Sequence, residues 1–185
     1  MISYNYRLPF DKIETAKALT HGWEISGVTT FSTGLPITLV ETDDHALTGT
    51  GFGGPIVLPV DTPNFSGGSV GKTDPRNNAH HYFFNIENFS QSAIGVEGNA
   101  NRRFFHGPGI NNWNIAIKKI TPIRESVSLE FRAELFNVFN HAQFINPSGL
   151  VPGPLGTSDV PLTNFGQVTA ARDPRLAQLG LKLNF

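Results

Sequence analysis

The sequence predicts an all-β protein, an antiparallel meander of about five strands that forms part of a transmembrane β-barrel. Three observations lead to this fold class. Apolar and polar residues alternate strictly in several segments, short and long connections alternate between those segments, and aromatic residues lie at the segment ends. We expect residues 1–185 to form one domain, the C-terminal part of an outer-membrane barrel.

The clearest predicted strand covers residues 127–135. Its odd positions are all apolar and its even positions are all polar: Val127, Leu129, Phe131, Ala133 and Leu135 against Ser128, Glu130, Arg132 and Glu134. Successive side chains of a strand point to opposite faces, so this pattern predicts one apolar face and one wet face. Residues 178–185 repeat the pattern, and that strand runs to the aromatic terminal residue Phe185.

Three further segments show the same alternation. They are residues 113–120, residues 23–31 with an extension to residue 40 left open, and residues 2–8. A turn over residues 121–126 joins two of the predicted strands, which therefore form a hairpin.

The connections between these strands fall into two classes. Residues 11–22 and 121–126 are short connections, whereas residues 41–112 and 136–175 are long and rich in Gly, Pro and Asn. In a meander this alternation places both short connections at one end and both long ones at the other. Outer-membrane barrels have short periplasmic turns and long external loops, so we expect the last strand to end at the periplasmic rim.

Aromatic residues fit the same frame. Phe10, Trp23 and Phe185 lie at the expected periplasmic ends, and Trp113, Phe136 and Phe139 lie at the expected external ends. Aromatic rings favour the headgroup region at both sides of a bilayer, so these positions predict two interfacial girdles.

The composition excludes other classes. The 14 Lys and Arg residues balance 15 Asp and Glu residues, which leaves no electrostatic case for binding nucleic acid. The chain has no cysteine, which excludes disulfides and thiolate metal sites. No apolar run approaches the roughly 18–20 residues of a membrane helix. The N-terminus lacks the features of a signal peptide, so we expect the chain to be a piece of a longer exported protein.

Several motifs span nearly the whole chain. They are Leu8-Pro9-Phe10, Gly22-Trp23-Glu24-Ile25-Ser26-Gly27, Thr33-Gly34-Leu35-Pro36-Ile37-Thr38, Gly107-Pro108-Gly109-Ile110-Asn111-Asn112-Trp113-Asn114, Phe131-Arg132-Ala133-Glu134-Leu135-Phe136-Asn137-Val138-Phe139-Asn140-His141 and Ala171-Arg172-Asp173-Pro174-Arg175. In this order they resemble the late barrel of Oar-like TonB-dependent outer-membrane receptors.

The resemblance implies a 22-stranded barrel with an N-terminal plug, which takes up a ligand with energy delivered from the inner membrane. The plug and the earlier strands are absent from these residues. The implied partners are outer-membrane lipid, the rest of the barrel and plug, the energy-coupling protein that contacts the plug, and the barrel assembly machinery. Phe185 would belong to the signal that this machinery reads.

Two groups of residues are candidates for function. If the odd face of the strands meets lipid, a polar row faces the lumen: Lys118, Glu130, Arg132, Glu134 and Lys182. We expect a ladder of cross-strand ion pairs there, with contact to the plug or a passing ligand as the functional alternative. The long connections carry the candidates for ligand contact outside the cell, which are Asp43, Asp44, His80, His81 and His106.

We expect no enzyme activity, no metal site and no cofactor. Residues 49–54 match a dinucleotide-binding glycine string, but Pro55 and further loop follow where a helix is required. Gly71-Lys72-Thr73 lacks the earlier glycine of a phosphate-binding loop. His80 and His81 are adjacent, so in a strand they would point to opposite sides and could not ligate one metal together.

Two other functions fit the same pattern. A secreted soluble β-sandwich that binds carbohydrate or protein through long loops would also have strands with one apolar face. An outer-membrane barrel that serves adhesion or surface anchoring, without uptake, would have the same sequence features as a transporter.

Overall fold

The computed structural model describes residues 1–42, 44–48, 61–151 and 164–185. These residues form two compact units. The sheet unit comprises residues 1–32, 110–143 and 172–185, and the loop unit comprises residues 33–109 and 144–171.

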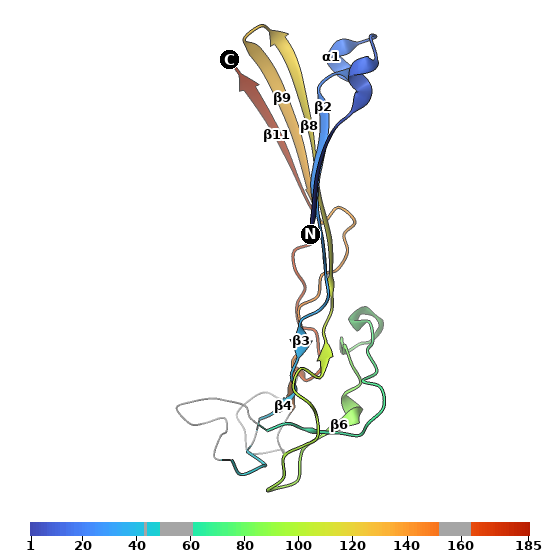
Figure 1. Ribbon diagram of the computed structural model, residues 1–185, viewed down its shortest axis with the longest axis vertical. Coiled ribbons are helices and arrows are strands. Elements are labelled where there is room, and N and C mark those ends of the chain that lie inside the picture. The colour runs from blue at the N-terminus through green and yellow to red at the C-terminus, as the bar shows by residue number, and fades with distance from the viewer. Residues whose placement is uncertain (43, 49–60, 152–163) are drawn as a thin grey trace. The chain divides into compact units, whose positions relative to one another are not determined.

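The sheet unit is a five-stranded antiparallel sheet in the order β1-β2-β8-β9-β11 (Figure 1). Its strands are β1 (Ile2–Arg7), β2 (Trp23–Ser32), β8 (Ile110–Arg124), β9 (Val127–Phe136) and β11 (Leu176–Asn184). The order of the five strands in the sheet is also their order in the chain, and the small strands of the loop unit lie between them in sequence. The predicted five-stranded meander is therefore confirmed.

The register gives this sheet two chemically distinct faces. One line of paired residues crosses all five strands on the apolar face: Tyr6, Ile25, Ile117, Ala133 and Leu179. One position along, the paired line on the other face is Arg7, Glu24, Lys118, Arg132 and Gly180. A shift of any strand by one residue would exchange its two faces, so the alternation in the sequence specifies this register.

The hairpin between β8 and β9 is longer than predicted. β8 continues to Arg124, and only Glu125 and Ser126 form the turn, so the predicted turn over residues 121–126 is wrong in extent. β8 pairs with β2 as far as Lys119, and Ile120 N still donates to Gly22 O at 3.0 Å. Beyond Ile120, β8 pairs with β9 alone. Pro122, which has no N–H to donate, is tolerated there, and a register irregularity follows it.

The short connection between β1 and β2 is folded by local contacts. It contains a 3-10 helix, η1 (Pro9–Lys12), and the short helix α1 (Lys17–Thr20). The Asp11 carboxylate accepts a hydrogen bond from Gly22 N at 2.9 Å and pairs with Arg7 at 3.0 Å, and these contacts lower the pKa of Asp11. Figure 1 shows α1, the β8–β9 turn and the C-terminus at the same end of the sheet. Among the described residues, no helix is long and apolar enough to cross a bilayer.

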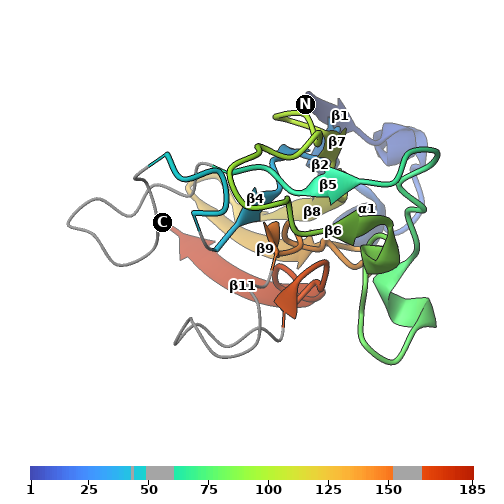
Figure 2. The same cartoon turned by 90° about the horizontal axis from the view of Figure 1, so that it is seen from below.

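The long connections contain more structure than the sequence predicted. The loop unit has three two-stranded pairings: β3 (Pro36–Ile37) with β7 (Phe105–His106), β4 (Val40–Glu41) with β10 (Leu150–Val151), and β5 (Asn64–Phe65) with β6 (Phe89–Ser90). It also has two 3-10 helices, η2 (Pro75–Asn77) and η3 (Ile86–Asn88). Figure 2 views this part of the chain with β5 beside β6.

A phenylalanine cluster forms the core of the loop unit. Phe84, at 1% exposure, is its centre, with ring centroids 5.0 Å from Phe105 and 5.4 Å from Phe165, both in edge-to-face geometry. The other buried members are Ile37, Leu39 and Phe89. Edge-to-face pairs add to the free energy gained by burying aromatic surface. The segments expected to be loops therefore fold around an apolar core of their own.

Candidate functional site

The five charged residues predicted to share one face do so. Lys118, Glu130, Arg132, Glu134 and Lys182 all lie on the polar face of the sheet. Lys182 is opposite Glu130 in the register, and Lys118 is opposite Arg132. Opposite and like charges therefore both occur as direct neighbours.

The ion pairs differ from a simple cross-strand ladder. Lys118 Nζ lies 2.8 Å from Glu24 Oε2 on β2, a partner that the sequence analysis did not select. Arg132 instead pairs along its own strand, with Glu130 at 3.2 Å and Glu134 at 3.5 Å. Glu24 was identifiable, because it is the polar residue between the apolar Trp23 and Ile25. Exposed pairs of this kind stabilise a fold by about 1 kcal/mol or less, so charge pairing does not hold the sheet together.

The apolar face carries aromatic residues near both ends. At one end, Trp113 makes edge-to-face contacts with Phe31 at 5.7 Å and Phe139 at 5.6 Å between ring centroids. At the other end, Lys119 Nζ lies 5.2 Å from the ring centroid of Trp23 and donates a hydrogen bond to His21 O at 2.9 Å. Between them, the row Leu179, Leu181 and Leu183 of β11 is 72%, 69% and 52% exposed. Such a continuous exposed apolar row suits contact with hydrocarbon rather than water.

The predicted place of Phe136 in the external aromatic girdle is wrong. Residues two positions apart in a strand share a face, so Phe136 lies on the same face as Glu130, Arg132 and Glu134. It pairs with Leu176 of β11. Its ring therefore lies on the polar face and not among the aromatics of the apolar face. The sequence analysis placed it by its position along the strand, whereas the parity of its position decides its face.

Phe136 lines a cleft of about 820 Å³ on the polar face, near the end of the strands where the long connections begin. The other walls are mostly amide, aliphatic and hydroxyl side chains, with one charged residue of each sign, Arg172 and Asp173. A volume of this size is typical of a small-molecule site. The cleft leaves no local signal in the sequence, because its residues come from four strands and the connection between β9 and β11.

Two buried amides hold the rim of the cleft. Gln143 is 3% exposed, donates through Nε2 to Asn111 O and accepts through Oε1 from Asn111 N at 2.9 Å. Asn137 has a left-handed φ of 47° and closes a turn by exchanging two side-chain hydrogen bonds of 3.0 Å with the backbone of His141. Asn accepts this conformation more readily than most residues. The backbone of Arg172 is attached to the same rim by its N–H, which donates to Gln143 O at 2.8 Å.

The predicted ligand residues of the long connections do not form one site among the described residues. Asp43 lies outside the described residues. Asp44 caps a local turn by accepting from Thr48 N at 2.7 Å, and His81 Nδ1 lies 2.8 Å from Pro75 O. His80 stacks near Tyr82, with ring centroids 5.5 Å apart, and His106 is exposed in β7. Within the described part of the chain, no group of His, Asp and Glu is arranged to hold a metal ion. The glycine string at residues 49–54 also lies outside the described residues.

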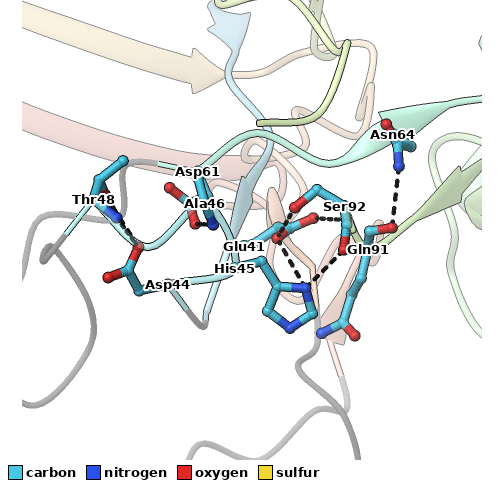
Figure 3. Close-up of polar contacts among 9 residues, drawn as sticks. All are labelled: Glu41, Asp44, His45, Ala46, Thr48, Asp61, Asn64, Gln91 and Ser92. Atoms are coloured by element: carbon cyan, nitrogen blue, oxygen red, sulfur yellow. Dashed lines mark hydrogen bonds and ion pairs between the residues drawn. The ribbon is translucent and has the colours of Figure 1, made fainter. Parts of the chain in front are cut away.

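A buried polar cluster in the loop unit escaped the sequence analysis (Figure 3). Glu41 is 2% exposed, and its carboxylate accepts from Ser92 N at 2.5 Å and from Ser92 Oγ at 2.9 Å. His45 Nδ1 lies 2.7 Å from Ser92 O and 4.0 Å from Glu41 Oε2. Asp61, also buried, accepts from Ala46 N at 2.7 Å. Its hydrogen bonds connect Glu41 with Ser92, which lies 51 residues later in the chain, so the cluster stabilises the fold of the loop unit.

Together, the amphipathic antiparallel sheet, its exposed apolar row and its aromatic ends define a membrane β-barrel wall. The comparison with protein families agrees: the model of the outer membrane beta barrel domain matches residues 1–178, and the chain belongs to that family. The protein is therefore a β-barrel protein of the bacterial outer membrane, and the soluble β-sandwich alternative is wrong. Searches of curated proteins and of solved structures found no match.

The two faces of β8 can be tested at one depth. Ile117 lies on the apolar face, and its neighbour Ala116 lies on the polar face opposite Glu134. In the full-length protein, Ile117→Arg should reduce the free energy of unfolding by about 2–4 kcal/mol, the cost of arginine on the lipid face near the bilayer centre. The matched variant Ala116→Arg should cost far less. Urea unfolding in lipid vesicles measures both, and equal losses would contradict the assignment of the faces.

Substitution of Glu41 in the buried polar cluster should reduce the stability of the loop unit. Glu41→Gln keeps the shape of the side chain but replaces one acceptor oxygen by an NH₂ group, which faces a donor on Ser92. Disturbing this buried hydrogen-bonded charge should destabilise the unit by about 1–3 kcal/mol. Hydrogen exchange of residues 33–42 and 61–109 should therefore accelerate. The exposed control Glu97→Gln should leave exchange unchanged, and similar rates in both variants would show that the cluster has no stabilising role.

Proposed function

We propose that this chain is part of the barrel wall of a TonB-dependent outer-membrane receptor of the Oar-like type, which takes up a ligand with energy delivered from the inner membrane. Two observations support the transporter within the barrel family. The motifs given in the sequence analysis occur in the order of those receptors, and several of them coincide with ordered features of the sheet unit, such as the turn that follows β9.

The order of the motifs carries the proposal of a receptor, and the topology of the meander supports its barrel. Both short connections lie at one end of the sheet, with the C-terminal residue of β11. Because the sheet has five antiparallel strands, β1 and β11 run in the same direction. Closing a fully antiparallel barrel therefore takes an odd number of further strands. A receptor barrel with an even total, such as 22 strands, meets this condition.

In this proposal the polar face lines the lumen and the apolar face meets lipid. The end with Phe185, α1 and the β8–β9 turn is periplasmic, and the loop unit lies outside the cell. Phe185 would belong to the signal that the barrel assembly machinery reads. The charged row on the polar face would contact the plug, and the plug would contact the energy-coupling protein. The role is non-enzymatic.

The proposal is tested by coupling. The full-length protein, purified in detergent, should bind the periplasmic domain of the energy-coupling protein in a surface-based binding assay. A matched protein that lacks the N-terminal coupling segment of the plug should not bind. If the full-length protein fails to bind, or if the deletion changes nothing, the barrel serves adhesion or surface anchoring instead of uptake.

A further inference from the structure

The cleft beside Phe136 has an unusual composition for the wall of a polar lumen. The charged row of the sheet lies outside it, and its one cationic residue, Arg172, is followed directly by the anionic Asp173. Its remaining polar residues are the hydroxyl of Thr30 and side-chain amides. The cleft therefore carries no net formal charge, which disfavours a phosphate, a carboxylate-rich chelate or a polycation as its ligand.

The amides of the cleft are partly committed to the fold. The side-chain amides of Asn137 and Gln143 already make hydrogen bonds to the backbone at the rim. Asn114 accepts from Asn137 N through Oδ1 at 3.0 Å, which does not involve its NH₂ group. Asn112 Oδ1 is buried and has no hydrogen-bond partner among the described residues. This oxygen is closed off from water, so the amide groups left for a ligand are the NH₂ group of Asn114 and the side chain of Gln178.

An aromatic ring completes the cleft. Phe136 is 38% exposed on the polar face, between the side chains of Glu134 and the rim residues. Pro174, Leu176 and Ile110 add further apolar wall. An exposed ring next to groups that both donate and accept hydrogen bonds fits a ligand with an apolar flat face and hydroxyl edges. Pyranose sugars have this combination, with axial C–H groups on one face and hydroxyls around the ring.

We infer that the cleft is a binding site for a neutral oligosaccharide, with one sugar ring stacked on Phe136 and its hydroxyls bound by Asn114 and Gln178. This inference names the ligand class of the receptor and rests on the proposed function for its role in uptake. Binding itself requires only the barrel wall. A volume of about 820 Å³ accommodates two or three sugar rings.

The test uses the full-length protein in detergent and four neutral trisaccharides: maltotriose, cellotriose, xylotriose and N,N′,N″-triacetylchitotriose. Saturation-transfer NMR at millimolar ligand should show binding of at least one of them. Phe136→Ala should weaken that binding about tenfold, because the apolar contact of the ring is lost. Phe136→Trp should retain it. Phe139→Ala is the matched control, since it removes a ring at the same end of the sheet but on the apolar face, and it should leave the affinity unchanged.

Two outcomes would overturn the inference. One is the absence of binding for all four trisaccharides. The other is binding that Phe136→Ala leaves unchanged, which would show that the sugar binds elsewhere in the protein, for example on the plug. The same preparation is assayed for binding of the energy-coupling protein. A coupled protein without sugar binding would fail this inference alone, whereas sugar binding without coupling would contradict the proposed uptake and leave the site in place.

Discussion

The antiparallel register of five strands is the constraint on which the rest of the sheet unit depends. Across the middle of the sheet, the pairings set apolar residues such as Ile25 and Ile117 opposite each other, and polar residues such as Glu24 and Lys118 opposite each other. Because the side-chain period of a strand is two, no strand can shift by one residue without exposing its polar side chains on the apolar face. The register thereby creates both surfaces that matter for function. One suits hydrocarbon, and the other carries the ion pairs and the cleft.

The fold of the sheet was predictable because its signal is local and repetitive. Alternation over residues 127–135 and 178–185 predicted both the strands and their faces, and the pattern of short and long connections predicted their order. The extent of the β8–β9 hairpin was not predictable in the same way. The expected turn included Pro122, yet β8 beyond Ile120 is paired with β9 alone, and a missing N–H has little consequence there.

The loop unit and the cleft depend on contacts that leave no periodic trace. Phe84, Phe105 and Phe165 lie at irregular intervals, and their clustering is visible only in three dimensions. The hydrogen bonds between Glu41 and Ser92 likewise connect residues 51 positions apart in the chain. The predicted charged row lies on one face, but the ion-pair partner of Lys118 proved to be Glu24. The predicted ligand residues of the loops follow composition alone, and the described ones make separate local contacts.

The motif after β9 now has a physical explanation. Asn137 and Asn140 both adopt left-handed φ values, and Asn140 Oδ1 accepts from Arg175 N at 3.1 Å. The run from Phe136 to His141 thus turns the chain and ties it to the segment before β11. The same run presents Phe139 to Trp113 on the apolar face and Phe136 to the cleft on the polar face. One short motif therefore contributes to both surfaces.

If the two faces of the sheet meet lipid and water respectively, side chains along β11 must alternate between these two environments. Spin labels placed singly at residues 177–183 of the full-length protein in lipid vesicles report collisions with oxygen, which is concentrated in hydrocarbon, and with a water-soluble nickel complex. We expect two period-two profiles in opposite phase, with oxygen maxima at Leu179, Leu181 and Leu183. Low collision rates with both reagents at those three positions would contradict it, because they would show that the apolar face packs against protein, as in a two-layer sandwich.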